Sequence, residues 1–289
     1  MQNKIILLFL IIFSLFFSKA HGDDQINFDV TEIEILDGGN KIIGKNRGTI
    51  NVTNGINIEA DEFEFDKTKN ILTATGNIKI EDKVNNNNFS AQNILYLKNK
   101  EEINLKGQVE AFINENYKFK TENITILRNE MIINSDIGAT ILDYANQTRY
   151  EIGKFSYSFS EEILKGEKFF INTKYDQPFS DKFFFKSAVF NLKDQSYIAQ
   201  DIKIDFRKDI FGNRNNDPRF NGLSSSSKNG ITTINKGIFT SCKKNDRCPP
   251  WSIQADKITY DQNKKQINYD NALVKVYDVP VLYFPKFFH

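Results

Sequence analysis

The sequence contains almost no histidine, which removes a large group of enzymes from consideration. His21 lies near the amino terminus and His289 is the last residue, so neither can complete a Ser-His-Asp or Cys-His arrangement in the body of the chain. No GxSxG motif, Walker loop or His-Glu-x-x-His motif is present, and no pair of carboxylates stands apart from the turns. We therefore expect a protein that is not an enzyme and that has no catalytic residue, cofactor or metal site.

Cysteine is nearly as rare, occurring only as Cys242 and Cys248 in the segment FTSCKKNDRCPPW. No further Cys or His lies nearby to complete a tetrahedral zinc site. In an exported protein the usual state of such residues is a disulfide. A local bridge between Cys242 and Cys248 is the simple case, and pairing with cysteines elsewhere is the alternative.

The chain has no excess of charge of either sign, because 38 Lys and Arg residues are interspersed with 37 Asp and Glu residues. Proteins that bind nucleic acids concentrate positive charge to displace counterions from phosphates, and this chain does not. Aromatic residues are abundant, with 26 Phe and 11 Tyr, although Trp occurs once. Phe and Tyr favour strands and fill cores, which points to a β protein.

Residues 1–22, MQNKIILLFLIIFSLFFSKAHG, are typical of a secretory signal peptide. The apolar run from Ile5 to Phe17 is shorter than the roughly 20 residues that a membrane helix needs. Small residues follow it, so we expect cleavage after Ala20 or Gly22 and export of the remainder. No Cys lies near this junction to carry a lipid anchor, and no later segment is apolar and long enough to form a membrane helix.

The segment IEADEFEFDKTKNILTATGNIKI, residues 58–80, predicts a strand, a short polar turn and a second strand. Related segments recur at 89–113, 119–142, 185–206 and 253–276, and the first three start at residues 58, 89 and 119, which are 31 and 30 residues apart. Such self-similarity indicates stacked units, each of which needs its neighbours to cover an apolar face.

Within each unit the alternation changes phase at an Ala-Asp step. Ile58 and Ala60 are in one phase, and Phe63 and Phe65 are in the other. A bend or bulge at the same point of every unit would fold the whole sheet along a line and leave an apolar inner face. We therefore expect an all-β fold, a folded antiparallel sheet of stacked repeats, with an inserted loop at residues 208–230.

Acidic residues recur once per unit at the expected bends and turns, as Asp61, Asp66, Asp256 and Asp261. Asp in such places usually accepts hydrogen bonds from nearby backbone, and we expect a structural role. Carboxylates from stacked units could still converge on one face.

The signal peptide, the Ala-Asp units and the closing passage resemble a known family. That passage, residues 237–289, reads GIFTSCKKNDRCPPWSIQADKITYDQNKKQINYDNALVKVYDVPVLYFPKFFH. It resembles the LptD-type LPS-assembly proteins, specifically their periplasmic N-terminal OstA-like domain, which is related to the carriers LptA and LptC. The resemblance covers the chain after the signal peptide and implies a β-taco or β-jellyroll domain over residues 23–289. It also implies an outer-membrane barrel after residue 289, so that this chain would be a fragment, and cysteine partners within that barrel.

The resemblance implies a function in lipopolysaccharide transport at the periplasm and outer membrane. The domain would take lipopolysaccharide from an LptA-like carrier and pass it to the barrel with its lipoprotein plug LptE. The acyl chains would lie in a groove, for which our candidates are Ile58, Ala60, Phe63, Phe65, Leu72, Ala74, Ile78, Ile80, Ile94, Tyr96, Ile124 and Ile126. Any of these could instead be ordinary core. A stand-alone periplasmic lipid carrier, a secreted adhesin or scaffold, and a β-helix enzyme acting on polysaccharide are the alternatives.

A folded sheet has open edges. The segment INFDVTEIEI, residues 26–35, alternates at Ile26, Phe28 and Val30 and then changes phase at Ile33 and Ile35. We expect it to form the N-terminal edge, where a carrier could add strands by backbone pairing.

Overall fold

The computed structural model describes residues 26–52, 56–83, 87–113, 116–177, 180–194, 196–208, 215–245, 250–261, 263–264 and 266–288. The expected signal peptide at 1–22 and Cys248 lie outside these residues. In the described part of the chain no helix is long and apolar enough to cross a membrane.

One antiparallel sheet of 20 strands makes up nearly the whole fold, which confirms the all-β prediction. Two short 3-10 turns interrupt it, η1 (Asp37–Gly39) and η2 (Lys98–Lys100). The strands of the first half are β1 (Asn27–Leu36), β2 (Lys41–Val52), β3 (Ile56–Ala60), β4 (Glu62–Asp66), β5 (Ile71–Asp82), β6 (Asn87–Leu97), β7 (Glu102–Ile113), β8 (Tyr117–Leu127), β9 (Ile132–Ser135) and β10 (Ala139–Asp143). Those of the second half are β11 (Thr148–Ile152), β12 (Lys154–Ser158), β13 (Ile163–Thr173), β14 (Lys182–Asn191), β15 (Ser196–Asp205), β16 (Arg219–Lys228), β17 (Ile231–Thr240), β18 (Trp251–Asp261), β19 (Gln266–Val276) and β20 (Val279–Phe288).

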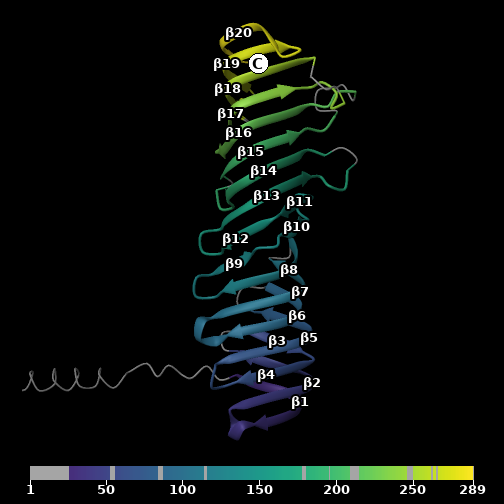
Figure 1. The fold of residues 1–289 in the computed structure, drawn as a ribbon, viewed down its shortest axis with the longest axis vertical. Coiled ribbons are helices and arrows are strands. Elements are labelled where there is room, and N and C mark those ends of the chain that lie inside the picture. Colours follow the sequence, from purple (N-terminus) through teal and green to yellow (C-terminus); the bar gives the residue numbers. More distant parts are fainter. Residues whose placement is uncertain are drawn as a thin grey trace, which may run out of the picture.

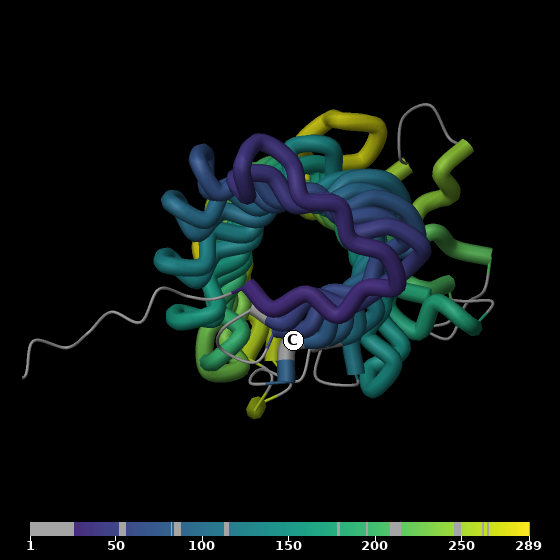
Figure 2. The backbone as a smooth tube through the Cα atoms, turned by 90° about the horizontal axis from the view of Figure 1, so that it is seen from below, coloured from purple at the N-terminus to yellow at the C-terminus, as the bar shows by residue number. Residues whose placement is uncertain are grey.

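The chain runs back and forth, and each rung of the sheet pairs with the next one in sequence. Three rungs are split into two short strands: β3 with β4, β9 with β10, and β11 with β12. The rungs lie one above another along the long axis from β1 to β20 (Figure 1). Seen along that axis, the backbone traces an oval outline, so the sheet is folded into a roll (Figure 2).

Every rung bends near its middle, as the phase change at the Ala-Asp step predicted. Asp61 lies between β3 and β4, opposite the pair Gly76 and Asn77 of β5, where the register shifts by one residue. Similar shifts follow at Ser90/Asn93 and Lys106/Val109. The bends line up from rung to rung and form a crease that divides the roll into two walls. Its outward residues include Asp61, Asn77, Gln92, Gln108, Glu122, Gly153, Lys168, Lys186, Asp201, Leu223, Lys236, Asp256 and Asn271.

The fixed period of the sequence has a backbone cause at one edge of the sheet, where successive hairpin turns are hydrogen-bonded to one another. The acceptor carbonyls lie 30 or 31 residues apart, at Asn40, Asn70, Glu101, Met131 and Glu162. The donor N–H groups, at 2.8–3.0 Å, belong to Lys67, Lys98, Arg128, Phe159 and Leu192. Because each turn stacks on the previous one, an insertion or deletion within these units would break a bond at the edge.

The expected loop at residues 208–230 is wrong for its second part, because Arg219–Lys228 forms strand β16. Phe220 and Ser225 of this strand are buried, and it pairs with β15 on one side and β17 on the other. Its run of serines resembles a loop by composition. Serine nevertheless fits an interior strand, because the neighbouring strands supply its backbone hydrogen bonds.

We predict that Gly76→Ala destabilises the roll more than Gly38→Ala does. Both glycines have positive φ, +78° and +62°, so both substitutions strain the backbone by about 1 kcal/mol. At Gly76 an added Cβ would also lie 2.9 Å from Cβ of Asp61, whereas Gly38 has nothing within 4 Å. We expect a loss of about 2–3 kcal/mol for Gly76→Ala in urea unfolding. Equal losses would show that the crease tolerates a side chain there.

Candidate functional site

The inner face of the roll carries two continuous rows of side chains, one on each wall, that run across the stacked rungs. In each row, every residue is the direct cross-strand partner of the next. The A row comprises Ile50, Ile58, Ile80, Phe89, Ala111, Phe119, Ile141, Tyr150, Ile171, Phe183, Ile204, Phe220, Phe239, Ile253, Val274 and Leu282. The B row comprises Ile42, Phe65, Leu72, Tyr96, Ile103, Ile126, Ile133, Tyr157, Leu164, Phe190, Tyr197, Ser227, Thr232, Tyr260 and Ile267.

Neither row contains a charged residue. In the middle of the stack the two walls touch: Phe119 of the A row lies edge-on to Phe155 of the other wall, with ring centroids 5.5 Å apart. Phe169, next to the crease, meets Phe190 of the B row at 5.2 Å. The fold therefore encloses an apolar interior that extends along the stack.

All twelve predicted groove residues lie in this interior, so the structure brings them together. Ile58 and Ile80 belong to the A row, and the B row holds Phe65, Leu72, Tyr96 and Ile126. The remaining six line the inside of the crease: Ala60, Phe63, Ala74, Ile78, Ile94 and Ile124. Eleven of the twelve are buried and Ile126 is partly buried, and all pack in one hydrophobic cluster.

The interior is filled in the N-terminal half of the stack. A-row residues from Ile50 to Phe119 are between 0 and 8% exposed. A side chain facing a water-sized void would keep accessible surface on that side, so these residues are covered by other side chains. A hydrocarbon chain could enter this half only if the walls moved apart.

The C-terminal half of the interior is less closed. Phe183, Phe239 and Ile253 of the A row are only partly buried, and Tyr260 of the B row is 41% exposed. Prediction from the sequence repeats missed this half because its units are degraded. The signal that could have located it is the cross-strand register, which continues both rows without interruption through β20.

Strand β1 lies at the N-terminal edge, as predicted, and within the described residues it pairs only with β2. Ile26, Phe28 and Val30 pack against the core. The register shifts between Val30 and Glu32, and beyond this point Ile33 and Ile35 are 51% and 62% exposed. The edge therefore offers both unpaired backbone and apolar side chains.

The acidic residues of the repeat have two kinds of partner. At turns the prediction of backbone bonds is confirmed: Asp66 accepts from the N–H of Lys69 at 3.0 Å, and Asp261 accepts from the N–H of Lys264 at 3.1 Å. At the crease the partners are instead side chains of neighbouring strands. Lys236 and Asn271 both donate to Asp256, at 2.6 and 3.0 Å.

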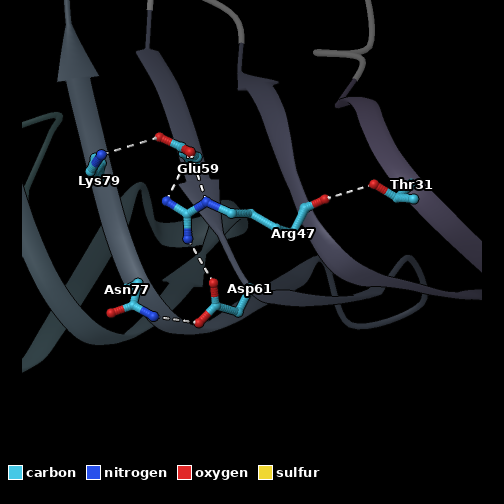
Figure 3. Close-up of polar contacts among 6 residues, drawn as sticks. All are labelled: Thr31, Arg47, Glu59, Asp61, Asn77 and Lys79. Atoms are coloured by element: carbon cyan, nitrogen blue, oxygen red, sulfur yellow. Dashed lines mark hydrogen bonds and ion pairs between the residues drawn. The ribbon is translucent and has the colours of Figure 1, made fainter.

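The same arrangement occurs near the other end of the crease, around Arg47 (Figure 3). Arg47 donates to Asp61 at 2.6 Å and to Glu59 at 2.9 Å, and Asn77 donates to Asp61 at 2.7 Å. Hydrogen bonds to Asp61 and then Glu59 raise the pKa of Arg47. Because these groups face outward and satisfy one another, we assign them to holding adjacent rungs together at the bend.

A second polar cluster anchors a turn over the B row. Tyr96 donates its hydroxyl to Glu101 at 2.8 Å, and Arg128 lies 3.1 Å from the same hydroxyl and pairs with Glu101 at 2.5 Å. Burial, followed by the bond to Glu101, raises the pKa of Tyr96 to about 12. The cluster satisfies the one polar atom that Tyr96 brings to the apolar interior.

Surface depressions lie outside the roll. The largest, of about 720 Å³, flanks the crease between β7 and β13 and is lined by charges of both signs such as Glu110, Lys120, Glu122 and Lys168. It faces away from the two rows, so its size does not bear on the interior. Among the described residues no group of three or more His, Cys, Asp or Glu comes together to hold a metal ion.

Cys242 is buried, and its thiol lies 3.6 Å from the carbonyl oxygen of Trp251. Because Cys248 lies outside the described residues, the bridge between the two stays a prediction.

No protein-family model matches the sequence, and no curated protein matches it significantly. The similarity to LPS-assembly proteins therefore stays an expectation, and the shape and chemistry of the interior carry the functional argument.

We predict that the protein loses stability as the pH rises from 10 towards 12. Burial raises the pKa of Tyr96, Tyr150 and Tyr269 to about 12, above the usual 10. The unfolded chain loses these protons first, so the stability they contribute is complete below pH 10 and is lost as the pH passes through 12. Tyr96→Phe removes one such group, and its free energy of unfolding should fall less steeply with pH than that of the wild type. Identical slopes in urea unfolding would contradict this.

Proposed function

We propose that this chain is a conduit for an acylated lipid, and that the lipid is lipopolysaccharide received in the periplasm for assembly at the outer membrane. The observation that carries the proposal is the pair of uncharged inward rows, which follow the roll from β2 to β20 and are least covered at the C-terminal end. The resemblance of the closing passage to LPS-assembly proteins supports the choice of lipid.

An interior of this kind suits transport because it provides no fixed stopping point. Burial of an acyl chain is worth about 0.8 kcal/mol per CH₂ group. Successive rungs present similar apolar surface, so a chain that moves by one rung exchanges one set of contacts for an equivalent set. The charged sugar headgroup would remain in water at the mouth between the walls.

The two halves of the interior differ in what lipid binding would gain. In the C-terminal half, a chain would cover apolar surface that water now touches. In the N-terminal half, it would replace contacts that the walls already make with each other, so the net gain is small. We therefore place the resting lipid near β15–β20, and passage through the N-terminal half requires the walls to separate.

A repeat scaffold or adhesin is the second candidate function, favoured by the filled interior between β2 and β8. Such a protein would take up no lipid along its whole length. Lipid uptake therefore distinguishes the two functions.

The test places a photo-crosslinking residue at Ile253, a partly buried member of the A row, and asks whether lipopolysaccharide adducts form in cells. Gln254 is the matched control because it neighbours Ile253 on the same strand and faces outward. We expect adducts at Ile253 and none at Gln254. Equal labelling at both positions, or none at either, would count against a lipid-filled interior.

We further propose that an LptA-like carrier docks on β1 by adding a strand to its free edge. Deleting residues 24–36 should abolish carrier binding in a pull-down, because it removes both the unpaired backbone and the exposed Ile33 and Ile35. Deleting 279–288, which removes β20 from the opposite end, should leave carrier binding intact. If both deletions reduced binding equally, β1 would not be the docking edge.

A further inference from the structure

The B row changes its chemistry between β15 and β18. Four consecutive members carry hydroxyl groups, Tyr197, Ser227, Thr232 and Tyr260, and Ser225 adds a fifth hydroxyl on the inner face beside them. Elsewhere in the same row the members are aliphatic or aromatic, with only two isolated tyrosines. We call these five residues the hydroxyl row.

The members of the hydroxyl row are close enough to hydrogen-bond to one another. The hydroxyl of Tyr197 lies 3.1 Å from Oγ of Ser225, and Thr232 donates to Oγ of Ser227 at 3.0 Å. These bonds use only part of their capacity, since each hydroxyl has one proton to donate and can accept twice.

Hydroxyls are a costly choice for an apolar interior, because each must be desolvated and paired. Ser225 is only 2% exposed, and the A row on the facing wall is apolar over the same rungs, at Phe220, Phe239 and Ile253. The aliphatic residues found in the equivalent rungs of the N-terminal half would cost less. Ser227 and Thr232 are half-buried and Tyr260 is more exposed, so a ligand could reach them.

We propose that the hydroxyl row binds the ester and amide carbonyl groups that join acyl chains to the sugar of a glycolipid, while the chains lie against Phe220, Phe239 and Ile253. This inference rests on the proposed function and specifies where in the interior the lipid is held. Carbonyl oxygens are neutral acceptors, and hydroxyls are neutral donors that match them. The row contains no Lys or Arg, so it lacks the cations that would favour a phosphate group.

Strand β16 provides a matched pair of variants. Ser225 and Ser227 face inward, whereas Ser224 and Ser226 alternate with them and face outward. The double variants Ser225→Ala/Ser227→Ala and Ser224→Ala/Ser226→Ala therefore make the same chemical change on opposite faces of one strand. Thr232→Val is a third variant, which removes a hydroxyl and keeps the shape of the side chain.

The test measures the binding of two fluorescent glycolipids to the purified full chain: one with ester-linked acyl chains, and its analogue with ether-linked alkyl chains. We expect Ser225→Ala/Ser227→Ala and Thr232→Val to weaken binding of the ester lipid about 5- to 10-fold, as expected for the loss of one hydrogen bond. Binding of the ether lipid should not change, and Ser224→Ala/Ser226→Ala should bind both lipids as the wild type does.

Two other results would overturn the inference in different ways. If the wild type binds both lipids and the inward variants weaken neither or both equally, the hydroxyl row does not recognise carbonyls, and the conduit remains. If the wild type binds neither lipid, the proposed function fails and this inference fails with it.

Discussion

Antiparallel hydrogen bonding between consecutive rungs is the constraint on which the rest of this structure depends. Each rung presents an apolar inner face that it cannot bury alone, and it is covered by the rungs above and below and by the opposite wall. The stacked turns at one edge, from Asn40 to Glu162, keep those rungs in register at intervals of 30 or 31 residues. Register in turn keeps every A-row and B-row residue facing inward, because a slip of one residue would reverse them all.

The crease turns this stack into a roll. At each bend two consecutive residues face outward, which restores the inward phase on the second wall and brings the walls face to face. Positive φ at Asn77, Lys236 and Asn271 and glycine at Gly76 provide the necessary backbone geometry. The acidic residues Asp61 and Asp256 join neighbouring rungs across it. The same device at both ends of the sheet produces one interior from many weak units.

That interior changes along its length, and the change matters for function. Close packing near β2–β8 is typical of a core, while partial exposure and hydroxyl groups near β15–β18 are typical of a surface that meets a ligand. A conduit needs both properties: a closed form that is stable without lipid, and a region where lipid can replace water. A uniformly packed stack would have the first property alone.

Period-two alternation, the phase change at Ala60-Asp61 and the 31-residue spacing were enough to predict an all-β stack folded along a line, its N-terminal edge and the inward set from Ile58 to Ile126. These features are local, because strand pairing and side-chain phase follow from a few neighbouring residues. The sequence misled at 219–228, where a serine-rich composition concealed strand β16, and it did not show whether the walls touch. Which side chains fill the space between the walls, and where Tyr197, Ser225, Ser227 and Thr232 meet, was decided only by the tertiary structure, because those contacts join residues brought together by the register of the sheet and the angle of its crease.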